Sequence, residues 1–122
     1  MDAKDAIDAG INAHRLWKQR LAEAVASGRS EWTPEDVCRD DGCDFGRWLR
    51  EGIAPRDRAT PHFAKVRALH AAFHQSAGQV LRLALGGRRA EAEQAIASGS
   101  AFTKASSALV VAMMDWKAAR RG

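Results

Sequence analysis

The stretch that decides the fold is Thr60–Leu85, which reads TPHFAKVRALHAAFHQSAGQVLRLAL. Its apolar side chains recur every three or four residues, a spacing that places them on one face of an α-helix. Thr60 and Pro61 are typical of an N-cap and a first helical position, and Gly86-Gly87 is typical of a helix end. The sequence therefore predicts one long helix. Its buried stripe comprises Phe63, Val66, His70, Phe73, Ala77, Val80 and Ala84.

Two further long helices are expected on either side of this segment. The first runs from about Asp2 to Ser27 and ends at Gly28, and the last runs from Ser100 or Ala101 to Arg120. Both repeat their apolar residues at helical spacing. The buried positions expected on the first are Ile7, Ile11, His14, Leu21 and Val25, and those on the last are Phe102, Ser106, Leu109, Met113 and Trp116.

Shorter helical pieces are expected between the long helices. Thr33-Pro34 is typical of the start of a short helix. After a break at Asp41-Gly42, a second piece over Asp44–Glu51 places three large apolar side chains on one face, and Gly52 and Pro55 end it. Those side chains are Phe45, Trp48 and Leu49.

The fold class follows from this pattern. Another short helix is expected over residues 88–97, and no stretch shows the sustained alternation that is typical of strands. The sequence predicts an all-α protein, an antiparallel four-helix bundle with an additional short helix that carries Cys43. We expect a single domain over residues 1–122.

Composition excludes several classes of function. The 122 residues include 19 Lys and Arg against 15 Asp and Glu, a net charge of +4, and the basic residues are interleaved with acids. Nucleic-acid binding is therefore not expected. The longest apolar run, residues 108–114, is far shorter than the roughly 20 residues that a membrane helix needs. The first residues lack a signal-peptide pattern and two cysteines make no disulfide framework, so we expect a cytoplasmic protein.

Three histidines and one cysteine are candidate metal ligands. His70 and His74 lie one helical turn apart, and His14 occupies the buried stripe of another helix. Buried imidazoles cost stability unless they are hydrogen-bonded or bound to a metal. Together with the sulfur of Cys43, three imidazole nitrogens would form a tetrahedron that suits zinc. The alternative is that His14 and His70 are hydrogen-bonded core residues, that His74 is exposed and that Cys43 only packs.

Three short motifs carry a family resemblance. The chain reads A-H-R-L-W over residues 13–17, C-D-F-G-R-W-L over residues 43–49 and H-A-A-F-H over residues 70–74. These runs resemble the chemoreceptor zinc-binding (CZB) family, whose pattern is A-H-x-x-W, then C-x-x-G-x-W-L, then H-x-x-x-H. All three elements are present in that order.

The resemblance implies a helical bundle, often dimeric, that binds one zinc ion through three His and one Cys. Carried over to this sequence, those ligands are His14, Cys43, His70 and His74. Members of the family mostly belong to bacterial chemoreceptors or nucleotide-cyclase signalling enzymes, and report zinc or oxidants such as hypochlorous acid. A homodimer and a signalling partner of either kind are therefore expected. The receptor hairpin and the cyclase domain are missing here, so we expect a free-standing domain.

The cysteines have separate expected roles. Cys43 is expected to be both zinc ligand and redox switch, because oxidation of its thiolate to sulfenic acid removes a ligand from the metal. Cys38, five residues earlier, is a candidate for resolving an oxidised Cys43 as a disulfide. The favoured interpretation of Cys38 is a buried spectator thiol.

The surroundings of the metal ligands are also open to prediction. Asp41 and Asp44 flank Cys43 and are candidates for orienting the imidazoles through their second nitrogen, although capping of the short helix or exposure to water is favoured. Trp17 and Trp48, which belong to the family pattern, are expected to wall the zinc site. His62 is two turns before His70, too far to share the metal, and is expected to be exposed.

Other functions compete with the sensor. A zinc hydrolase needs an open position for water, but a Cys as fourth ligand closes the coordination sphere and no H-E-x-x-H motif is present. A di-iron oxygen carrier of the hemerythrin type needs more His and carboxylate ligands than a chain with four His supplies. We therefore expect a non-catalytic sensor of zinc or oxidants. The alternative is a zinc-stapled dimerisation module without a sensing role.

Overall fold

The computed structural model describes residues 2–120, and within that range every regular element is a helix. The prediction of an all-α fold is therefore confirmed. Met1, Arg121 and Gly122, which belong to the predicted domain, lie outside the described residues. No helix of the described range has the length and apolar character needed to span a bilayer.

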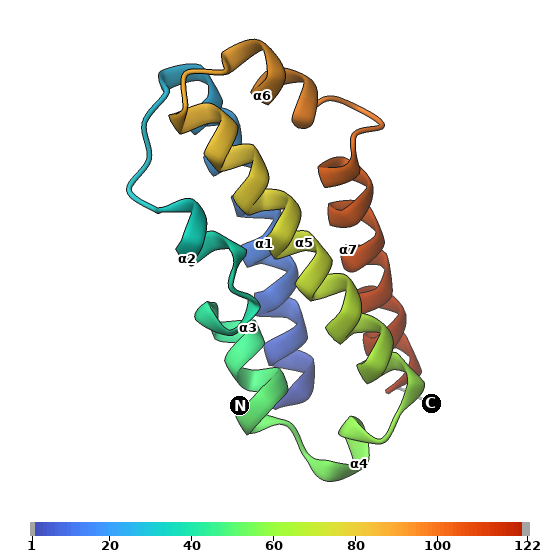
Figure 1. Ribbon diagram of the computed structural model, residues 1–122. Coiled ribbons are helices and arrows are strands. Elements are labelled where there is room, and N and C mark those ends of the chain that lie inside the picture. Colours follow the sequence, from blue (N-terminus) through green and yellow to red (C-terminus); the bar gives the residue numbers. More distant parts are fainter. Residues whose placement is uncertain (1, 121–122) are drawn as a thin grey trace.

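Three long helices form the body of the molecule (Figure 1). They are α1 (Ala3–Ser27), α5 (Pro61–Leu85) and α7 (Ala101–Ala119). The first two run in the same direction, and α7 returns between the same ends in the opposite direction (Figure 1). All the residues predicted for the three apolar stripes are buried.

The ends of these helices follow the predicted capping chemistry. Gly28 ends α1 with a positive φ of 71°, a conformation that glycine adopts without steric cost. The hydroxyl of Thr60 accepts a hydrogen bond from the N–H of Phe63 at the start of α5. Ser100 caps α7 in the same way. Each of these caps satisfies a backbone group that the first or last helical turn leaves unpaired.

Between α1 and α5 the chain returns along the bundle as a series of short helices (Figure 1). The series comprises α2 (Pro34–Cys38), the 3-10 turn η1 (Asp40–Gly42), α3 (Asp44–Arg47), the π-helical turn η2 (Trp48–Gly52) and α4 (Pro55–Arg58). The piece predicted over Asp44–Glu51 is thus two turns of different winding. Pro55, expected only to end the preceding helical piece, also begins α4, since proline suits a first helical position.

The short helix α6 (Arg89–Ala95) crosses one end of the bundle instead of running along it (Figure 1). Its sequence explains this position, because Ala92 is its one buried residue and a helix needs an apolar stripe to lie along a core. The place beside α1 and α5 is taken by the chain that leads from α2 to η2. That chain contains Cys43, so its packing decides where the thiol lies.

Candidate metal centre

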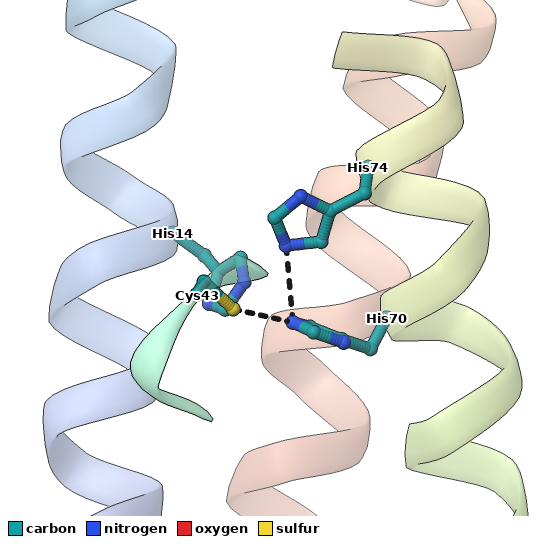
Figure 2. A group of neighbouring side chains, drawn as sticks. All are labelled: His14, Cys43, His70 and His74. Atoms are coloured by element: carbon teal, nitrogen blue, oxygen red, sulfur yellow. Dashed lines mark hydrogen bonds between the residues drawn. The ribbon is translucent and has the colours of Figure 1, made fainter. Parts of the chain in front are cut away.

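Four side chains from three separate segments meet inside the bundle (Figure 2). One comes from α1, one from the start of α3 and two from α5. Their potential ligand atoms all lie within 4.8 Å of one another, in a group that could hold a metal ion. We call this group the metal cluster; its members are His14, Cys43, His70 and His74.

His70 lies at the middle of the metal cluster. Its Nε2 atom is 3.1 Å from Nε2 of His74 and 3.2 Å from Sγ of Cys43 (Figure 2). The four-residue spacing on α5 brings the two imidazoles together, as expected for neighbours on one helical face. His74 is only 3% exposed. The alternative in which His74 faces solvent is therefore wrong, because α2 packs against α5 and covers this side chain.

Cys43 is the N-cap of α3, and its position depends on two backbone contacts. Its sulfur accepts a hydrogen bond from the N–H of Gly46 at 3.3 Å and lies 3.7 Å from the carbonyl oxygen of Asp40. Burial raises the pKa of the Cys43 thiol, whereas the N–H groups of Gly46 and Phe45 act in the opposite direction. A metal cation beside the sulfur would favour the thiolate, which is the form that binds metals.

Two imidazoles have their tautomer set by backbone carbonyls. Nδ1 of His14 donates to the carbonyl oxygen of Gly10 at 2.6 Å, and Nδ1 of His74 donates to that of Val37 at 2.9 Å. A carbonyl oxygen can only accept, so the proton of each neutral ring lies on Nδ1. The Nε2 atoms of both rings are thereby left unprotonated, as metal binding requires.

Burial also keeps the three imidazoles neutral. It lowers the pKa of His14 to about 4 and the pKa of His70 to about 2, and in both cases neighbouring histidines add to the effect. The pKa of His74 is lowered as well, again mainly by burial. Near pH 7 all three rings are therefore in the form that binds metals.

The donor set fits zinc. Nε2 of His14 is buried and has no hydrogen-bond partner in the described part of the chain, a costly state for a polar atom unless a ligand satisfies it. Three neutral imidazole nitrogens and one sulfur match the ligands of four-coordinate zinc. The metal cluster contains no carboxylate, which a di-iron centre requires.

The acidic residues beside Cys43 that were candidates for orienting the imidazoles pair with arginines instead. Asp41 pairs with Arg39 at 3.3 Å and with Arg50 at 2.8 Å, and these hydrogen bonds lower its pKa. Asp44 pairs with Arg47 and its side chain is 97% exposed. In the described part of the chain neither acid hydrogen-bonds to an imidazole of the metal cluster; backbone carbonyls do so instead. The role of these carbonyls could not be predicted from the sequence, because every residue has a backbone carbonyl.

The two tryptophans of the motifs lie along a groove that reaches the metal cluster. The groove has a volume of about 900 Å³, and Trp17, Trp48 and Cys43 are among its lining residues. Trp17 pairs with Trp32, their ring centres 5.0 Å apart, and the guanidinium of Arg20 lies over both rings. Trp17 and Trp48 therefore line the same groove as Cys43, His14 and His74.

Cys38 and His62 were not predicted to bind the metal, and both lie outside the metal cluster. Cys38 and Cys43 are both free thiols, and Sγ of Cys38 faces Gly78 of α5. His62, at the start of α5, is partly buried and not exposed as predicted.

Comparison with known proteins agrees with this geometry. A family model described as the chemoreceptor zinc-binding domain matches residues 14–81, more than half of the chain. The match begins at the first residue of the metal cluster and spans the other three. No curated protein and no solved structure matches the chain.

Proposed function

The chain belongs to the chemoreceptor zinc-binding domain family, and from this premise we propose that it is a non-catalytic regulatory domain with one zinc ion. The observation that carries the proposal is the buried Nε2 atom of His14, which has no hydrogen-bond partner among residues 2–120 and lies among three further donors. The proposed ligands are His14, Cys43, His70 and His74.

Each protein group has a distinct task in this site. When bound, zinc supplies the positive charge that stabilises the Cys43 thiolate. The carbonyls of Gly10 and Val37 hold their histidines with Nε2 toward the metal. Four protein donors fill a tetrahedral sphere and leave no position for the water that a zinc hydrolase activates, so we propose no enzymatic activity.

The sensing role is proposed to depend on Cys43. The groove gives a small oxidant access to the partly buried sulfur. With hypochlorous acid, the thiolate sulfur forms a bond to oxygen while the oxygen–chlorine bond breaks, which yields a sulfenic acid and chloride. The sulfur is then a poor ligand and a weaker acceptor for the N–H of Gly46, so α3 loses its N-cap and its tie to α5.

The wider context is part of the same proposal. We propose that residues 1–122 form one domain of a cytoplasmic, bacterial protein, because the two free thiols need a reducing compartment. The series α2 to η2 is proposed as the fourth member of an antiparallel four-helix bundle. A homodimer is supported by exposed apolar side chains on α1 and α7, namely Leu16, Val111 and Met114. The downstream partner would be a chemoreceptor or a cyclase.

A second candidate function is a zinc-stapled dimerisation module. It is favoured by the origin of the ligands in three separate segments, since a metal held this way ties α1, α3 and α5 together. A staple holds its zinc during oxidant challenge, whereas a sensor releases zinc or changes shape.

Metal analysis of the untagged protein tests the zinc site. We expect about one zinc per chain, as a mononuclear site requires, and strongly reduced zinc in His70→Ala and Cys43→Ala. His62→Ala is the matched control, because it removes an imidazole from the same helix outside the metal cluster. Two irons per chain, or no metal after zinc titration, would contradict the proposal.

Oxidant challenge then separates sensor from staple. Zinc release after hypochlorous acid is measured with a chromophoric chelator, and Cys43 oxidation is followed by mass spectrometry. Release that rises with Cys43 oxidation, in both the natural chain and Cys38→Ser, supports the sensor. Zinc that stays bound while Cys43 is oxidised favours the staple.

A further inference from the structure

Helix α2 packs against α5 with no room for a side chain at Gly78. A Cβ atom built on Gly78 would lie 2.1 Å from Sγ of Cys38, 3.1 Å from the carbonyl oxygen of Pro34 and 3.3 Å from Cα of Cys38. The first of these separations is far shorter than any contact between carbon and sulfur. Alanine at this position would therefore force Sγ of Cys38 to move and would press the backbone of α2 away from α5 by a few tenths of an ångström.

The same part of α2 carries the backbone partner of a proposed zinc ligand. Val37, beside Cys38, accepts the hydrogen bond from Nδ1 of His74 at 2.9 Å. Gly78 follows His74 by one turn of α5, so the close approach and the hydrogen bond lie next to each other on one helical face. A displacement of α2 at Gly78 would lengthen this hydrogen bond.

Helix propensity alone does not favour glycine at this position. Gly78 lies inside a 25-residue helix, where alanine is intrinsically more favourable than glycine. Its φ is not positive, so the backbone itself would accept alanine. The close approach of α2 is thus the structural feature that favours glycine over alanine at position 78.

We infer that Gly78 is a positioning residue for the metal centre: by admitting α2 against α5, it lets the Val37 carbonyl hold His74 with Nε2 toward the other donors. The inference rests on the proposed zinc site and adds a determinant of its affinity. Gly78 contacts no metal, and it acts through Val37 and His74.

The test compares zinc affinities of the full chain by competition with a chromophoric chelator. We expect Gly78→Ala to weaken zinc binding on the order of 10–100-fold, the range typical of lost support behind a metal-bound histidine. The cobalt-substituted protein should show altered d–d bands, a change that lost stability alone would not produce. Gln79→Ala is the matched control, since it adds the same helix former at an exposed neighbouring position.

A rescue variant and a double-mutant cycle test whether Gly78 acts through α2 and His74. Cys38→Ala removes the closest clashing atom, so in the Gly78→Ala background it should restore most of the affinity and the cobalt spectrum. In a His74→Ala background, Gly78→Ala should have no further effect on zinc affinity.

Three results would overturn the inference. They are an unchanged affinity and spectrum in Gly78→Ala, a loss of affinity that Cys38→Ala does not recover, and an equal loss in the presence and absence of His74. Failure of the natural chain to bind zinc would instead overturn the proposed function, so the two failures are distinguishable.

Discussion

Nδ1 of His74 lies 2.9 Å from the carbonyl oxygen of Val37, although the two residues are 37 positions apart in the sequence. This hydrogen bond links helix α5, which carries two members of the metal cluster, to the short helix that precedes Cys43. The same contact decides which nitrogen of His74 is free for a metal. The position of α2 and the orientation of His74 in the metal cluster are thus linked through this hydrogen bond.

Removal of zinc should lower the stability of the protein. A ligand that binds only the folded state stabilises it by about 4 kcal/mol when its free concentration is 1,000 times Kd. We expect a lower Tm in EDTA than with excess zinc, measured by circular dichroism. In His74→Ala the difference between the two conditions should shrink strongly. Equal Tm values in the natural chain would contradict a structural contribution of the metal.

The metal-free protein should lose stability on acidification. An unfolded histidine titrates near pH 6.5, whereas burial lowers the pKa of His14 to about 4. Below pH 6.5 the unfolded chain therefore binds more protons, and the free energy of unfolding falls as the pH decreases toward 4. Each pKa unit corresponds to about 1.4 kcal/mol. Urea denaturation in EDTA at several pH values measures this slope, which His14→Gln should reduce and Gln79→Ala, at an exposed position without a titratable group, should leave unchanged.

Gly46→Ala should disrupt the start of α3. Its Cβ would lie 1.7 Å from the carbonyl oxygen of Asp40 and 3.1 Å from the ring of His70, so backbone must move. We expect a loss of about 2–4 kcal/mol in the free energy of unfolding together with weaker zinc binding. Gly42→Ala is the control, because its closest neighbour would be an ordinary contact at 3.7 Å. Equal behaviour of the two variants in urea and zinc titrations would contradict the prediction.

Arg120→Ala should destabilise the protein more than Arg47→Ala. Arg120 pairs with Asp57, whose side chain is 9% exposed, whereas the partner of Arg47 is 97% exposed. Loss of Arg120 leaves a buried carboxylate without its cation, which costs about 2–3 kcal/mol. Loss of an exposed pair costs little. Chemical denaturation of both variants checks this order, and a larger effect for Arg47→Ala would refute it.

Local sequence patterns predicted the long helices closely. The stripe of α5 from Phe63 to Ala84 is buried, and its caps at Thr60 and Gly86 are where the residue types indicated. Such features depend on spacing and capping within one segment, so they can be read without knowledge of the rest of the chain. The winding of η2 and the start of α4 were not predicted, since single turns contain too few residues for a period.

The donor types of the metal cluster were also predictable, because His70 and His74 share one helical face and the family motifs add His14 and Cys43. The groups that orient the imidazoles were not predictable. Asp41 and Asp44 were the acidic candidates, but the structure pairs them with arginines and gives the imidazoles to the carbonyls of Gly10 and Val37. A carbonyl belongs to every residue and therefore has no signature in the sequence.

The sequence by itself determined the helices, their buried faces and the donor types of the metal cluster, since these depend on local spacing and side-chain chemistry. Only the tertiary structure decided the distances within the metal cluster, the tautomers of His14 and His74 and the close approach of α2 at Gly78. Each of these depends on how closely segments far apart in the chain approach. That approach is set by packing between side chains and backbone, which no single segment contains.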